Sequence, residues 1–434
     1  MRDLGWVAHF FCFYKTLFRE PSAFKIQDNL VLGMNESYGF LKSMKFTNQA
    51  QLAYCTNVHR GNSWAETFNA LEKYVMDVRK RVASDKRFAI GLRLSAEAGR
   101  ELSDPAEINR FRKWLDQKNA YIFTINGFPY GNFHGTRVKE EVYRPDWTTQ
   151  ERLDYTLLLF SILEQLLESG EEGSVSTLPG SFKEFLPKNT IPELMFKNLE
   201  TCALEIERLA GPKNLDLHLG MEPEPLGMFE TTPETVSFFE KLFQSTSTEE
   251  ILRKRIGVNY DCCHLAIEYE DAHEGLDAYV NRGIRLSKLH LSSALSVIPN
   301  SNNLEKLRSF VEPVYLHQVA LGKEGVCIQR IKDLDLALDA QKANKLPDAD
   351  EWRVHFHVPL HASPGKELGD TRIHVLDTLF WLSKNPEMCK HLEMETYTWE
   401  VLPDHLQAGS VVEQVAREYN WTLEQMTNIG FELA

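Results

Sequence analysis

The sequence predicts an α/β protein whose eight parallel strands, each followed by a helix, close into a (β/α)8 or TIM barrel. From residue 50 onward, short apolar runs alternate with longer segments in which apolar residues recur every three or four positions. That alternation is typical of parallel strands joined by helical crossovers. The runs number eight, and no Gly-x-Gly-x-x-Gly follows the first of them, so a closed barrel is favoured over an open dinucleotide-binding sheet.

Each predicted strand is a short apolar run, and the helices between them begin at typical caps. Ser63 and Glu66 have the spacing of a capping box, and Thr148 and Glu151 repeat it before a helix that extends to about residue 168. The eight predicted strands cover residues 51–58, 87–94, 120–127, 173–180, 215–223, 255–261, 284–291 and 391–399.

The spacing of these elements is irregular at two places. Residues 1–48 differ in composition from the rest and are expected to be an N-terminal extension, which leaves 49–434 for the barrel. About 100 residues separate the seventh and eighth strands, and they include the β-like run 352–361. Because loops at the carboxyl end of a barrel carry function and tolerate length, we expect an insertion at about 295–365, over the barrel mouth.

The composition restricts the partners and the compartment. The 48 basic and 62 acidic side chains give a formal net charge of −14, which would repel nucleic acid on average. The seven cysteines are scattered without a repeated Cys-x-x-Cys spacing, as in proteins of a reducing compartment. The N-terminal residues lack a small-residue cleavage site, and no run reaches the ~18 apolar residues that a membrane span needs. We therefore expect a cytoplasmic protein without a transmembrane span or a nucleic-acid partner.

Polar residues gather where the predicted strands end, and in a barrel of this kind the active site lies at the carboxyl ends. Four successive strands end in an acid, an acid, a histidine and an acid, which can converge because neighbouring strands lie ~4.8 Å apart. Carboxylate with imidazole suits Mn²⁺, Zn²⁺, Co²⁺ or Mg²⁺, so the sequence predicts a site for such a divalent ion. The polar residues at these ends are Glu222, Glu224, Asp261, His264, His290, Glu393 and Glu395, with Asn57, His59 and Asn126 on earlier strands.

The segment NYDCCH, residues 259–264, admits three interpretations. It could be a metal site at Asp261 and His264, a pair of redox cysteines, or the polar end of a buried strand. Adjacent cysteines bridge each other only with a strained geometry, which favours two structural thiols. A single acid at a strand end is more often a helix cap or an ion-pair partner. Polar ends on four consecutive strands favour the metal site.

Short phrases at the strand ends resemble a known superfamily. GMEP, NYDCCH, KLHLSS and EMET are similar to the metal-binding strand ends of the xylose isomerase-like TIM barrels, which include sugar isomerases, sugar epimerases and endonuclease IV-type repair enzymes. The longer phrases AYCTNVHRG, TINGFPYGNFHGTRVKEEVYRPDW, VSTLPGSFK and METYTWEVLP resemble the EboE family of metabolite-traffic proteins. The resemblance extends from about residue 50 to 405, and the first 48 residues have no counterpart in it.

The resemblance implies roles for individual residues. It makes Glu222 and Glu395 metal ligands that double as general acid and base, and His264 a catalytic residue that binds substrate or a second ion. A histidine, His355, stands where endonuclease IV-like enzymes have an aspartate, which argues against their extra zinc. Glu224 and Glu393 lie two residues from the chosen acids on the same strand face and stay open as alternatives. The implied metal ligands are Glu222, Asp261, His290 and Glu395, and the implied substrate-binding residues are His59, Asn126, His134, His264, Lys288, His355 and His357.

Three functions agree with these features to different degrees. The resemblance implies a metal-dependent isomerase or epimerase that acts on a polyol or carbonyl metabolite. The EboE phrases imply a part in the export of a metabolite precursor, with docking to a membrane transport partner, and such a factor could bind its metabolite without turnover. An endonuclease IV-like phosphodiesterase is disfavoured by the negative charge and by His355 in place of aspartate.

Overall fold

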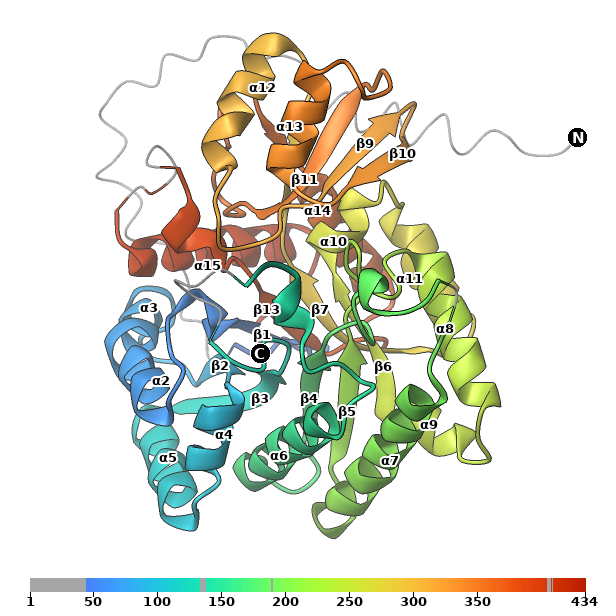
Figure 1. Ribbon diagram of the computed structural model, residues 1–434. Helices are drawn as coiled ribbons and strands as arrows, with labels where there is room; N and C mark the ends of the chain where they lie inside the picture. The colour runs from blue at the N-terminus through green and yellow to red at the C-terminus, as the bar shows by residue number, and fades with distance from the viewer. Residues whose placement is uncertain (1–43, 133–137, 189, 404–406, 408) are drawn as a thin grey trace, which may run out of the picture. The chain divides into compact units, whose positions relative to one another are not determined.

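Eight parallel strands form the centre of the fold (Figure 1). The computed structural model describes residues 44–132, 138–188, 190–403, 407 and 409–434. Within them the strand order is β1-β13-β7-β6-β5-β4-β3-β2, and a parallel bridge from Cys55, just after β1, to Gly91 in β2 closes the ring. The predicted barrel of eight parallel strands is therefore confirmed. The strands are β1 Gln51–Tyr54, β2 Phe88–Arg93, β3 Ala120–Asn126, β4 Glu172–Thr177, β5 Asp216–Met221, β6 Ile256–Asp261, β7 Arg285–Leu291 and β13 His391–Met394.

Several predicted strands extended too far at their carboxyl ends. The predicted strand 51–58 ends at Tyr54, and Thr56–Val58 form a 3-10 turn instead. The predicted strand 391–399 likewise ends at Met394. Most of these residues are buried, as strand residues would be, but they leave the sheet to enter the loops at the barrel mouth.

Helices follow the strands around the outside of the barrel (Figure 1). The capping box of Ser63 and Glu66 is confirmed at the start of α2. The second predicted box is wrong by one residue, because Thr149 caps α6 while the Thr148 hydroxyl bonds to Asp146. The helices are α2 Trp64–Ala70, α3 Met76–Val82, α4 Ala96–Leu102, α5 Pro105–Gln117, α6 Gln150–Leu166, α7 Glu193–Ala210, α8 Thr232–Gln244, α9 Glu249–Arg255, α10 Cys262–Ile267, α11 Ala272–Val280, α14 Arg372–Lys384 and α15 Val411–Asn428. Among the described residues, none of these helices has the length and apolar character to cross a lipid bilayer.

A second, antiparallel sheet lies between β7 and β13 in the chain. Its five strands have the order β10-β9-β11-β8-β12 and pack with two helices on a hydrophobic core of their own, which includes Trp352, Val354 and Phe356. Strand β11 ends at His355 and His357, whose rings reach the carboxyl end of the barrel. The elements are β8 Ala294–Val297, α12 Ser301–Leu307, β9 Val319–Lys323, β10 Val326–Ile331, α13 Leu334–Lys342, β11 Glu351–His357 and β12 Gly369–Asp370.

Candidate metal centre

Four side chains converge at the carboxyl end of the barrel from four adjacent strands. Asp261 ends β6 and His290 lies in β7, while Glu222 and Glu395 follow β5 and β13 by one residue. One donor atom of each lies within 4.8 Å of the others. His290 Nδ1 lies 3.1 Å from Glu222 Oε1 and 3.2 Å from Glu395 Oε2. It lies 3.5 Å from Asp261 Oδ2. The structure thus brings together the four residues that were predicted as metal ligands.

The four side chains of the cluster are buried. Within the described residues, the ion pairs of Glu222, Asp261 and Glu395 are with histidines alone. Burial by itself would lower the pKa of His290, but Glu395 and Glu222 raise it well above its usual value. Asp261 Oδ2 is buried without a hydrogen bond. A divalent cation would satisfy this oxygen and neutralise the carboxylates, so the donor set fits such an ion.

A buried ion pair behind His290 fixes the orientation of its ring. His290 Nε2 donates to Glu393 Oε2 at 3.0 Å, and Lys288 Nζ donates to the same oxygen at 2.6 Å. Nδ1 therefore faces the cluster. In metal sites, a hydrogen bond from the other ring nitrogen to an outer partner orients a ligating histidine in this way. Glu393, the alternative to Glu395, therefore lies behind the cluster. It also requires a glycine at Gly91 in β2, where a Cβ atom would lie 1.8 Å from Glu393 Oε1.

Neutral donors hold the three carboxylates in place. Each carboxylate accepts a hydrogen bond on one oxygen, which orients the group and leaves its other oxygen for the cluster. The donors are Asn259 to Glu222 (2.7 Å), Ser292 to Asp261 (2.7 Å) and Asn57 to Glu395 (2.6 Å).

The geometry around NYDCCH decides between its three interpretations. Asp261 Oδ1 accepts the backbone N–H of His264 at 3.0 Å and so caps α10, while Oδ2 faces the cluster. Asp261 is thus both a helix cap and a candidate metal ligand, and the three-residue spacing places the His264 ring beside it. Cys262 and Cys263 are buried free thiols, and burial raises the pKa of Cys262 to about 12 and that of Cys263 well above its usual value. Two neutral, unbridged thiols are structural residues rather than a redox pair.

A second group of donors adjoins the first. His264 Nδ1 donates to the Pro223 carbonyl at 3.0 Å, and His355 Nδ1 donates to Gln318 Oε1 at 2.7 Å. Their Nε2 atoms face each other across 3.0 Å. A carboxylate oxygen of Glu224 lies within 4.8 Å of both rings, and Glu224 Oε1 is buried without a hydrogen bond. This group could hold a second cation or accept the protons of ligand hydroxyls.

Two further residues predicted for substrate binding, Asn126 and His357, lie beside Glu395. Asn126 Nδ2 is 3.3 Å from Glu395 Oε1, and Asn126 lines the pocket described below. His357 Nδ1 donates to the Glu395 carbonyl at 2.9 Å, and its buried Nε2 has no hydrogen bond.

The structure does not bring His59 or Lys288 to this pocket. The His59 ring stacks on Tyr74 with centroids 4.7 Å apart, outside the mouth formed by the strand ends. The Lys288 side chain is fully buried in the barrel, where it contacts Glu393 and donates to Ser176 at 3.0 Å. His134 lies outside the described residues.

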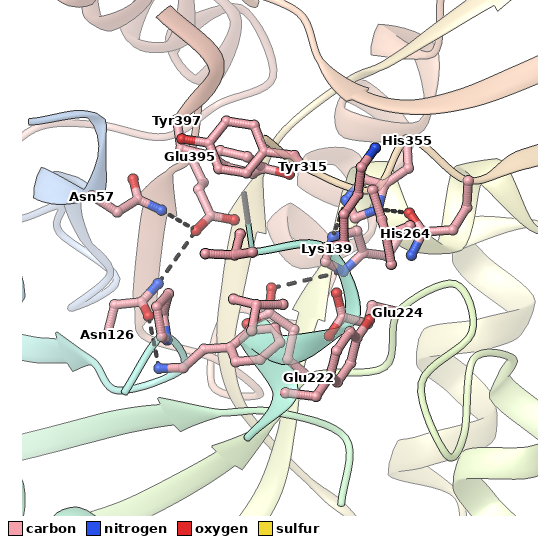
Figure 2. A pocket seen from close by; sticks show the side chains of 17 residues that line it. Asn57, Asn126, Lys139, Glu222, Glu224, His264, Tyr315, His355, Glu395 and Tyr397 are labelled. Carbon is pink, nitrogen blue, oxygen red and sulfur yellow. Dashed lines mark hydrogen bonds and ion pairs between the residues drawn. The ribbon is translucent and has the colours of Figure 1, made fainter. Parts of the chain in front are cut away.

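A pocket of about 90 Å³ opens on the cluster (Figure 2). Glu222, Glu224 and Glu395 line it, together with His264 and His355, and Figure 2 shows Glu395 across the pocket from Glu222 and Glu224. Phe128 and Tyr397, two aromatic residues that the sequence offered as possible walls, line the pocket as well. The other walls come from turns and loops that sequence reasoning missed, because such segments carry no periodic signal. These residues are Pro129, Val138, Lys139, Val142, Tyr143, Tyr315, Leu316 and Gln318.

Another group of acids and histidines lies at the opposite, amino end of the barrel. Glu172, His218 and His391 also have donor atoms within 4.8 Å of one another. Here the chain supplies its own cations: Arg285 Nη2 lies 3.0 Å from Glu172 Oε1, and Lys390 Nζ lies 2.9 Å from Glu172 Oε2. This carboxylate is therefore already neutralised, and the group is a structural ion-pair network.

Taken together, the fold and the site define a TIM-barrel protein with a buried carboxylate–histidine centre at the carboxyl end. No protein-family model matches the chain, and no curated protein matches it. Solved structures to which it is similar include the zinc-bound IolI protein (10% identity, TM-score 0.42, 87% of this chain and 98% of that one). Others are L-ribulose 3-epimerase (10%, 0.45, 88% and 95%) and the Methylomonas sp. D-allulose 3-epimerase in complex with D-allulose (11%, 0.46, 88% and 99%). At these identities and scores the similarities identify no substrate for this chain.

Proposed function

We propose that this chain is a metal-dependent isomerase or epimerase that acts on a small hydroxy-carbonyl metabolite. The observation that carries the proposal is the convergence of three buried carboxylates and an imidazole at the barrel mouth without a lysine or arginine to balance them. Glu222, Asp261, His290 and Glu395 would hold the ion. When bound, a divalent ion polarises a substrate carbonyl and its neighbouring hydroxyl and so acidifies the adjacent C–H.

The residues of the chain would move the proton. Glu222 and Glu395 both face the pocket, and they come from strands β5 and β13, which are separated by β6 and β7 in the sheet. Carboxylates that approach a substrate from two directions can remove a proton on one side and return it on the other. His264 and His355 would accept hydrogen bonds from substrate hydroxyls through their facing Nε2 atoms.

We also propose that this reaction serves the handling of a metabolite precursor. Support comes from the four phrases that resemble the EboE family of metabolite-traffic proteins. Binding without turnover, the function of an accessory factor, is the alternative outcome of the experiment below.

Proton exchange tests the proposed chemistry directly. The protein loaded with Mn²⁺ or Zn²⁺ would be incubated in D₂O with hydroxyketones of three to six carbons, and loss of the α-proton signal followed by NMR. We expect exchange with the parent protein and a decrease of ~100-fold or more for Glu395→Gln, the range for loss of a general acid or base. The matched control is Glu400→Gln, a partly exposed glutamate that pairs with Arg60, and it should exchange at the parent rate. Metal-loaded protein that binds these ketones without exchanging their protons would refute catalysis and support the accessory function.

A further inference from the structure

One part of the pocket lining away from the carboxylates is apolar. Val138 and Val142 flank one side, and Leu316 faces them from the loop before β9. Phe128 and Pro129, after β3, complete this part of the lining. A ligand that reaches beyond the carboxylates therefore meets hydrocarbon, and burial of hydrocarbon stabilises a bound apolar group.

Two neutral polar side chains of the lining, Gln318 and Asn126, are committed to the protein. Gln318 accepts from His355 and donates to the Pro225 carbonyl at 2.9 Å. Asn126 Nδ2 is directed to Glu395, and its Oδ1 accepts the backbone N–H of Phe128 at 3.1 Å. Ligand hydroxyls that lie against the apolar residues would lose water without partners in exchange, which weakens the binding of a ligand with hydroxyls along its whole length.

Among the described residues, the lining offers an anionic ligand no lysine or arginine that is free of a carboxylate partner. Among the described residues that line the pocket, Lys139 is the one lysine, no arginine is present, and Lys139 Nζ lies 2.5 Å from Asp333 Oδ2. Three glutamates, Glu222, Glu224 and Glu395, face the same space. A phosphate or carboxylate on the ligand would meet these acids without a counter-charge from the chain.

From these three features we infer that the pocket takes an uncharged hydroxy-carbonyl compound whose polar end lies on the carboxylates and whose remaining part is apolar. The inference rests on the proposed function for the polar end, since Glu222 and Glu395 belong to the proposed centre. The inferred ligand differs from an open-chain sugar, whose hydroxyls continue along the whole carbon chain. It also differs from a sugar phosphate, which is charged.

Matched ligands test the inference on the full chain loaded with Mn²⁺. Hydroxyacetone and 1-hydroxy-3-phenylpropan-2-one share the same hydroxyketone end and differ by one phenyl ring, and calorimetry would give both dissociation constants. We expect the phenyl compound to bind at least about tenfold more tightly, because most of the added ring would be buried. Dihydroxyacetone phosphate should bind more weakly than dihydroxyacetone. Equal affinity for the first pair, or tighter binding of the phosphate, would overturn the inference.

Variants locate the effect in the apolar wall. Val142→Asn should remove most of the preference for the phenyl compound and so bring the two dissociation constants close together, and Val138→Asn provides a second variant should the first not fold. The control is Val326→Asn on β10, a residue that is 64% exposed and does not line the pocket. Metal content is measured on the same samples. Protein that binds no metal contradicts the proposed function, whereas metal-loaded protein without a phenyl preference contradicts this inference alone.

Discussion

The two ends of the barrel contain the same kinds of residue in opposite electrostatic situations. At the amino end, Glu172 contacts His218, Arg285 and Lys390, so its charge is matched by the chain itself. At the carboxyl end, the ion pairs of Asp261 within the described residues are with histidines alone, and one of its oxygens is buried without a hydrogen bond. A cluster of acids and histidines therefore indicates a metal site only where the protein does not supply its own cations.

The largest expected effect is on metal content, and it should separate the two ends. Asp261→Asn removes a charged donor from the proposed centre, so the variant should lose more affinity than the ~10–100-fold expected for an outer-shell partner. Glu172→Gln should retain the ion at the parent stoichiometry. Elemental analysis of both variants after equilibration with Zn²⁺ checks this, and retention by Asp261→Asn with loss by Glu172→Gln would reverse the assignment.

Glu393→Gln should affect both stability and metal binding. The change leaves the fully buried Lys288 without its carboxylate partner, which typically costs about 3–5 kcal/mol. It also removes the acceptor behind His290, so metal affinity should fall by ~10–100-fold. Urea unfolding and metal titration measure the two effects. Normal stability together with normal affinity would show that Glu393 does not support the centre.

The amino end should be sensitive to acid through its histidines. Burial lowers the pKa of His391 to about 3, below an ordinary value of about 6.5. Between these values the unfolded chain binds a proton that the folded chain does not, so His391 decreases stability as the pH falls below about 6.5. From pH 7 to pH 5 the loss is about 2 kcal/mol, and His391→Asn should remove this part of the pH dependence. Unfolding curves at pH 5, 6 and 7 test it, and parallel losses in both proteins would disprove it.

The smallest expected effect concerns Lys390 at the amino end. Its side chain is 40% exposed, and Arg285 remains beside Glu172 when Lys390 is replaced. Lys390→Met should therefore change the free energy of unfolding by less than about 1 kcal/mol. A loss of several kcal/mol would mean that Arg285 does not suffice to balance Glu172.

The sequence predicted the barrel and the residues of the cluster because both depend on local patterns. Apolar runs mark the strands, and parallel pairing then places successive strand ends at one rim, which is how Glu222, Asp261 and His290 could be grouped. The sequence alone did not decide which glutamate of the last strand faces the cluster. Glu393 and Glu395 lie on the same strand face, and either could be a metal ligand. The part of the apolar wall around Val142 was missed because Val142 lies in a 3-10 turn, Lys139–Tyr143, where no sequence period connects a residue to the site.

Anomalous diffraction from crystals soaked in Mn²⁺ or Zn²⁺ tests the central claim most directly. The account predicts a peak bounded by Glu222, Asp261, His290 and Glu395, and none beside Glu172, His218 and His391. A map without a peak at the first group, or with its strongest peak at the second, would contradict it.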